Sequence, residues 1–187
     1  KSTIMKILYG LERMDAGEII IDGMPVSIKS VQDSSRYGIG MVHQHFMLVN
    51  ELPVYENIFL GIEQTKLGFL KSKDMSEEVL RLAEKYDMPI DPHAICNTLP
   101  VGAAQKVEIL KVLARGAKIL ILDEPTNGLD PKGIVEVRDL IINIAREQGK
   151  TILISSHILS EVEKMVNKVG IIHKGKLIEE INQEGKR

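Results

Sequence analysis

Two adjacent carboxylates, Asp123 and Glu124, directly follow an apolar run of four residues at 119–122. Such a run is typical of a buried strand, and ligands bind at the carboxyl ends of strands in open α/β sheets. At that position an aspartate can hold a metal ion, and an adjacent glutamate can take a proton from water. Hydrolysis of a phosphate ester requires both of these functions.

The chain opens on Lys1, Ser2 and Thr3, the tail of the phosphate-binding pattern G-x-x-x-x-G-K-[ST], whose glycines are absent here. Lys1 would place a point charge on the β- and γ-phosphates, Ser2 would bind Mg²⁺, and Thr3 would lie beside the α-phosphate. The helix that they begin would add unpaired N–H groups and a positive dipole end. We therefore expect a fragment that starts inside this motif and lacks the preceding strand and loop.

Strand patterns and helix patterns alternate along the sequence, which predicts an α/β fold with a mostly parallel sheet covered on both faces. Strands are expected at 18–21, 39–42, 118–122 and 151–154, and helices at 1–13, 102–114 and from Pro131 to a stop at Gly149. The pattern predicts one domain, 1–187, in which residues 55–115 form a helical subdomain.

The composition narrows the class of protein. A chain of 187 residues with 44% hydrophobic and 27% charged residues can form one globular domain with a sizeable core. Its net charge of −2 argues against a nucleic-acid partner. Cys96, the single cysteine, excludes an internal disulfide. No signal peptide is evident, and no apolar run approaches the roughly 18 residues of a membrane span. A membrane role would therefore require other chains.

Further motifs accompany the two carboxylates. Pro-Thr-Asn-Gly-Leu-Asp-Pro follows Glu124, and Ser-Ser-His157 follows the apolar run at 151–154. Together with Lys-Ser-Thr at the start, this order resembles the ATPase domain of ABC transporters, a P-loop NTPase, over nearly the whole chain. The resemblance implies that ATP and Mg²⁺ are the cofactors and that the activity is ATP hydrolysis.

The resemblance also implies a function for each residue. Asp123 would hold Mg²⁺ through water, Glu124 would be the general base, and His157 would contact the γ-phosphate. Gln44, in Met-Val-His-Gln-His-Phe, would touch both the metal and the attacking water and would move with the membrane partner. Asp130 would belong to the loop that reaches the nucleotide of a partner subunit.

The signature segment of the family is the weakest match. It reads Leu-Pro100-Val101-Gly102-Ala-Ala-Gln here, whereas the family patterns are L-S-G-G-Q and, among sugar importers, L-S-V-G-E-Q-Q. Pro100 removes a hydroxyl and a backbone N–H, although Gly102 still allows a close approach to phosphate. We therefore expect the segment to dock on a partner's ATP with fewer donors. A catalytically impaired nucleotide-binding module is one alternative for this reason.

The two parts of the chain resemble different relatives. Residues 1–115 resemble the ATPases of simple-sugar and nucleoside importers, and residues from Asp123 onward resemble bacitracin-type exporter ATPases. We favour import, because the helical insert and the Gln44 loop are the parts that touch membrane chains. An exporter-type ATPase of antibiotic or multidrug resistance remains the main alternative. ABC proteins of DNA repair fit less well, because the insert is compact and the chain is acidic. Ribosome-acting ABC proteins carry two such domains on one chain, so a second domain downstream would leave them open.

The resemblance implies several partners. They are transmembrane permease subunits, a second ATPase domain in a head-to-tail dimer and, for an importer, a substrate-binding protein. The location would be peripheral, on the cytoplasmic face of the cell membrane. For the chain as given we expect poor ATP binding and reduced stability, because a missing central strand leaves sheet edges unpaired.

Overall fold

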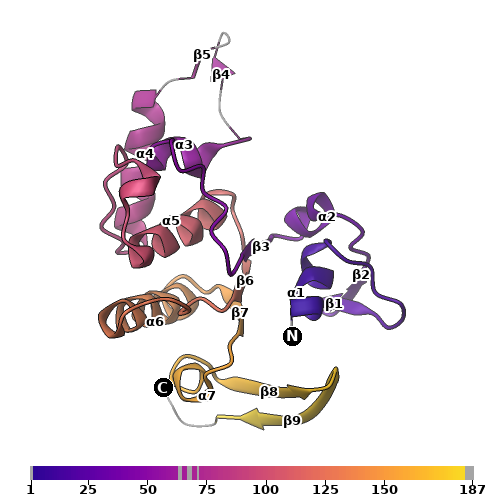
Figure 1. The fold of residues 1–187 in the computed structure, drawn as a ribbon. Helices are drawn as coiled ribbons and strands as arrows, with labels where there is room; N and C mark the ends of the chain where they lie inside the picture. The colour runs from indigo at the N-terminus through magenta and orange to yellow at the C-terminus, as the bar shows by residue number, and fades with distance from the viewer. Residues whose placement is uncertain (1, 63–64, 67–68, 71, 184–187) are drawn as a thin grey trace.

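The computed structural model describes residues 2–62, 65–66, 69–70 and 72–183 (Figure 1). The elements are, in chain order, α1 (Ser2–Tyr9), β1 (Ile19–Ile21), β2 (Met24–Val26), α2 (Val31–Arg36), β3 (Ile39–Val42), α3 (Val54–Phe59), β4 (Thr65–Lys66), β5 (Phe69–Leu70), α4 (Ser72–Lys85), the 3₁₀-helix η1 (Cys96–Thr98), α5 (Val101–Ala114), β6 (Ile119–Asp123), α6 (Pro131–Arg146), β7 (Thr151–Ser155), α7 (Leu159–Val162), β8 (Lys168–His173) and β9 (Lys176–Asn182).

Three strands form the parallel sheet that the sequence predicts. Their order is β3-β6-β7, and both strand pairs are parallel. Figure 1 shows these strands at the centre, with α3, α4 and α5 on one side and α1 and α2 on the other. The α/β fold class is therefore confirmed.

The side chains of β6 alternate between two cores. Leu120 and Leu122 belong to the larger cluster, which includes residues of α3, α5 and α6. Ile121 belongs to the smaller cluster, together with Met5 of α1 and Met41 of β3. Successive side chains of a strand point to opposite faces, so a strand that is apolar throughout is buried on both. Leu120, Ile121 and Leu122 are each at most 1% exposed.

The first helix is shorter than predicted. We expected a helix over 1–13, but α1 ends at Tyr9 and Gly10 follows with φ of 81°. A side chain is strained at this φ, and a Cβ at Gly10 would come within 2.3 Å of the Ser30 carbonyl oxygen. The left-handed Gly10 ends the helix, and the Leu11 N–H donates back to the Lys6 carbonyl at 2.8 Å, although the apolar spacing continues to Leu11.

The helices α3, α4 and α5 gather in one group, as Figure 1 shows. The group contains Cys96, which is 5% exposed, and Asn57, whose Nδ2 donates to the Cys96 sulfur at 3.1 Å. Helix α5 also packs against β3 and α6, so the group adjoins the sheet. The division of one domain, 1–187, into a core and a helical subdomain at 55–115 stays a prediction. Within the described ranges, no helix is both long and apolar enough to cross a bilayer.

A cavity of about 1190 Å³ lies along β7. Its apolar lining includes Ile4 and Met5 of α1, Ile152 and Ile154 of β7, and Val169 of β8. Among the described strands, β7 pairs only with β6. The other side of β7 is therefore an open sheet edge that faces this cavity.

Leu110 should be essential for the larger core, because its side chain is 0% exposed in the middle of α5. Leu110→Ala should lower the free energy of unfolding by about 2–5 kcal/mol, since it removes buried methyl groups and leaves a cavity. Urea denaturation followed by circular dichroism measures this loss. The matched control is Leu80→Ala on α4, where the side chain is 49% exposed. Equal losses in the two variants would contradict the core described here.

Candidate active site

The carboxyl ends of β6 and β7 place Asp123 beside Ser155. The two residues are partners in the parallel ladder, and the Ser155 hydroxyl donates a hydrogen bond to Asp123 Oδ1. Asp123 is only 9% exposed, so its charge requires partners. A carboxylate offers about four acceptor positions, and a single hydroxyl leaves capacity for a cation or its bound water.

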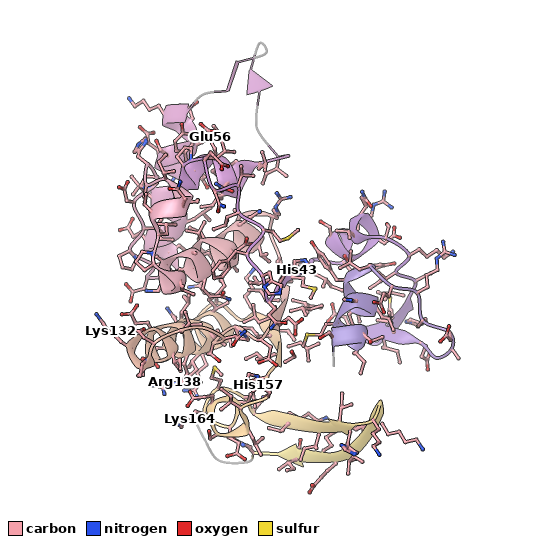
Figure 2. The ribbon with its side chains drawn as sticks, in the orientation of Figure 1. His43, Glu56, Lys132, Arg138, His157 and Lys164 are labelled. Carbon is pink, nitrogen blue, oxygen red and sulfur yellow. The ribbon has the colours of Figure 1, made fainter. Side chains whose placement is uncertain are left out.

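The structure brings Glu124 and His157 into direct contact. Glu124 Oε2 lies 2.8 Å from His157 Nδ1 and accepts a 3.3 Å hydrogen bond from the His157 backbone N–H. The glutamate side chain is 16% exposed and the histidine side chain 64% exposed. Figure 2 shows His157 just beyond the end of β7. The proposed base therefore meets the proposed γ-phosphate contact at the same edge of the sheet.

The backbone of Glu124 is strained. Its φ is 52°, in the left-handed region that non-glycine residues seldom adopt. Such a conformation costs on the order of 1–3 kcal/mol and gathers at functional sites. Two hydrogen bonds hold it, from Glu124 N–H to the Ser155 carbonyl at 3.0 Å and from Asn127 N–H to the Glu124 carbonyl at 3.1 Å. The turn thus directs this carboxylate away from the strand and toward His157.

Gln44 follows β3 on the same edge of the sheet. Val42, the last residue of β3, pairs with Leu122, which directly precedes Asp123. Figure 2 labels His43, which directly precedes Gln44, where the chain leaves β3 toward the helical group. The Gln44 side chain is exposed, and no hydrogen bond joins it to Asp123 within the described part of the chain.

Asp130 caps helix α6. Its Oδ1 accepts a hydrogen bond from Gly133 N–H at 2.8 Å, and Pro131 occupies the first helical position. Both residues are typical of a helix start. Asp130 therefore has a structural function in addition to the contact with a partner's nucleotide that the sequence predicts.

The signature segment lies against the start of α6. Pro100 is the N-cap residue of α5 and makes no side-chain capping hydrogen bond. A Cβ added at Gly102 would be 3.8 Å from Leu129 Cδ2 and 4.0 Å from Gly133 Cα, so the two helix starts nearly touch. Val101 is 45% exposed on the outer side. The structure thus brings Pro100, Val101 and Gly102 close to the Asp130 loop.

The first three residues of the chain are the remaining members of the predicted set. Lys1 lies outside the described residues. Ser2 begins α1, and the exposed Thr3 follows it. Helix α1 packs against β3 and β6 through Met5, which joins the smaller core.

The donor set fits Mg²⁺. The Ser2 hydroxyl, the Gln44 amide and the Asp123 carboxylate would offer oxygen ligands, which Mg²⁺ prefers. No group of three or more His, Cys, Asp or Glu side chains that could hold a metal occurs among the residues described. Mg²⁺ does not need such a group, because it keeps several waters and binds one or two carboxylates together with substrate phosphates.

Two features of the site were not predicted from the sequence. One is the hydrogen bond from Ser155 to Asp123, and the other is the contact between α5 and the backbone of Met47. Ser155 could have been found from the strand pattern, because it follows the apolar run beside the one that ends at Asp123. The Met47 contact has no sequence signal, since 61 residues separate its partners.

Comparison with known proteins assigns this arrangement to a family. The family described as ABC transporter matches residues 1–127. The chain therefore belongs to the ABC transporter family. It is 42% identical over 181 residues to the nucleoside import ATP-binding protein NupA of Lactococcus lactis subsp. cremoris, covering 97% of this chain and 36% of NupA. It is 43% identical over 182 residues to the guanosine import ATP-binding protein NupO of Bacillus subtilis, again covering 97% and 36%.

These relatives are longer proteins, and the chain spans about a third of their length. The alignment with each of these import proteins nevertheless covers 97% of this chain, so it includes most of the last third, where we expected a resemblance to exporter ATPases. Among solved structures, cbiO1 from Clostridium perfringens, part of the ABC transporter complex cbiONQ, matches with a TM-score of 0.81 and 28% identity over 98% of this chain and 72% of that chain. The cassette MJ1267 in its ADP conformation matches in fold with a TM-score of 0.85 and 22% identity over 98% and 76%.

The cap at Asp130 can be separated from its proposed contact with nucleotide. Asp130→Ala should lower the free energy of unfolding by about 1 kcal/mol, because it leaves the Gly133 N–H without its acceptor. Asp130→Asn should retain the stability, since asparagine caps helices as well as aspartate does. Thermal denaturation of the two variants tests this. Equal destabilisation by both substitutions would contradict the capping function.

Proposed function

We propose that this chain is the ATP-binding and ATP-hydrolysing part of a transporter that imports nucleosides or simple sugars through separate membrane subunits. The observation that carries the proposal is the cluster of Asp123, Glu124 and His157 at the carboxyl ends of β6 and β7. The relatives support the cargo class, because they are named for import of nucleosides, guanosine and ribose.

In this proposal Glu124 is the general base. Its carboxylate takes a proton from water as the water oxygen bonds to the γ-phosphorus and the bond to the β-phosphate oxygen breaks, which yields ADP and phosphate. His157 Nδ1 and the His157 N–H hold Glu124 Oε2 in place. The exposed imidazole can also turn toward the γ-phosphate.

Binding of the nucleotide involves the start of α1 and the end of β6. Lys1 and Ser2 would hold the phosphates and Mg²⁺, Thr3 would lie beside the α-phosphate, and Asp123 would bind Mg²⁺ through water. Mg²⁺ supplies charge neutralisation on the β- and γ-phosphate oxygens. Gln44 would contact both this cation and the attacking water.

The proposed assembly is a head-to-tail pair of ATPase domains bound to permease subunits, with a substrate-binding protein for import. Pro100, Val101, Gly102 and the Asp130 loop lie together at the starts of α5 and α6, so one surface could meet the partner's nucleotide. The similar cbiO1 structure is described as part of a transporter complex. The location would be peripheral, on the cytoplasmic face of the membrane.

A second candidate function is a binding module with weak hydrolysis. The observation behind it is the uncapped N-terminus of α5, where Pro100 makes no side-chain capping hydrogen bond and has no backbone N–H. A partner's γ-phosphate would then find fewer donors than in relatives with serine at this position.

Removal of the base tests the proposed function. Glu124→Gln should lower the ATPase kcat by about 10²–10⁴-fold, because an amide cannot accept the proton from water. The Kd for ATP should not change. Steady-state hydrolysis measures kcat, and nucleotide titration measures the Kd for ATP, both on the full-length protein. Glu147→Gln, at the exposed C-terminal end of α6, is the control. Undiminished hydrolysis in Glu124→Gln would exclude Glu124 as the general base.

The signature segment gives a separate test. Pro100→Ser should raise the ATPase rate, because serine restores a hydroxyl and an N–H at the N-cap of α5. The rate should be measured with the permease subunits present, so that the dimer can form. An unchanged rate would contradict the second candidate function, because the proline would then be no handicap.

A further inference from the structure

Helix α5 binds both backbone polar groups of one residue, Met47, in the loop after Gln44. The Met47 N–H donates to Glu108 Oε1 at 2.6 Å, and the Met47 carbonyl accepts from Lys111 Nζ at 3.0 Å. Glu108 and Lys111 are three residues apart, so they lie on one face of α5. Met47 itself follows Gln44 by three residues.

The contact from Glu108 is a fixed point of the structure. Glu108 is only 4% exposed, and a carboxylate is seldom buried unless it is hydrogen-bonded. Hydrogen bonds to ionised groups are also about twice as strong as neutral ones. Among the described residues, the Met47 N–H is the hydrogen-bond donor assigned to this buried carboxylate, so its loss would leave the carboxylate unpaired there. The loop is therefore tied to α5 more firmly than by a surface contact.

A second anchor lies two residues further along the loop. Asn57 of α3, which is 0% exposed, accepts from the Val49 N–H at 2.7 Å and donates to the Val49 carbonyl at 3.0 Å. Residues 47–49 are thus bound to the helical group, whereas Val42 is bound to β6 in the sheet. Gln44 lies in the short bridge between these two fixed regions.

We propose that Glu108 and Lys111 form a backbone clamp that positions Gln44 according to the placement of α5. This inference rests on the proposed function, in which Gln44 contacts the cation and the attacking water. Glu108 lies about two helical turns from Pro100, where α5 would meet the partner's nucleotide. A movement of α5 at that contact is passed through Met47 to Gln44. Glu108 and Lys111 are therefore positioning residues and do not touch the substrate.

The clamp itself can be tested without nucleotide. Glu108→Ala should speed hydrogen exchange of the Met47 amide by about tenfold or more, because the amide loses a charged acceptor. Glu108→Gln should keep the exchange slow, since its amide oxygen still accepts. Exchange is measured by NMR on the whole protein. Glu136→Ala is the control, because Glu136 binds Lys106 of the same helix at 2.7 Å. Unchanged exchange in Glu108→Ala would overturn the clamp.

Transmission to Gln44 is tested by hydrolysis. Lys111→Met is the second variant, because its partly exposed side chain can be replaced without burying a void. Glu108→Ala and Lys111→Met should lower kcat about tenfold, the equivalent of one lost charged hydrogen bond, with no change in the Kd for ATP. Glu108→Gln should keep kcat near the wild-type value, because its amide oxygen still accepts from Met47. If the negative charge alone mattered, this variant would lose activity as well.

The outcomes separate the two proposals. A wild-type protein that hydrolyses no ATP would overturn the proposed function and the link to turnover, while the exchange of Met47 would still decide whether the clamp exists. Wild-type hydrolysis that persists undiminished in Lys111→Met and Glu108→Ala, despite fast exchange at Met47, would overturn transmission alone. A fall in melting temperature that accounts for the lost kcat in both variants would also overturn it.

Discussion

The parallel pairing of β6 on both of its sides is the constraint on which the site depends. Because β3, β6 and β7 run in the same direction, their carboxyl ends meet at one edge. The register places Leu122 beside Val42 and Asp123 beside Ser155. A slip of one residue would exchange the two faces of β6 and turn Asp123 away from Ser155. The same register therefore determines both the core and the chemistry.

The residues that follow the strands were predictable because their signals are local. The apolar run at 119–122 predicts a buried strand, and Asp130 before Pro131 predicts a helix start; both elements are present. The end of α1 was missed, because the apolar spacing continues to Leu11, although Gly10 is a residue type that commonly ends helices.

The contacts within the site depend on distant pairing and could not be predicted in detail. The sequence placed Glu124 and His157 at neighbouring strand ends, but the 2.8 Å contact between them requires the left-handed turn at Glu124. The hydrogen bond from Met47 to Glu108 of α5 joins residues that are 61 positions apart. It uses the backbone N–H of Met47, which any residue type except proline would offer, so the sequence does not reveal it. Helix α5 thus connects three parts of the site that lie far apart in sequence: the signature segment, the start of α6 and the Gln44 loop.

The buried thiol of Cys96 has a consequence of another kind. Burial, together with the negative charge of Glu108, raises the pKa of Cys96, and Asn57 Nδ2 lies 3.1 Å from its sulfur. Because the thiolate is the reactive form, the raised pKa and the burial of Cys96 both slow its reaction with electrophiles while the surrounding helices stay closed. Each reaction of Cys96 would then record one opening of the helices around it. The rate at which Cys96 is modified would therefore measure how often the group of helices α3, α4 and α5 opens.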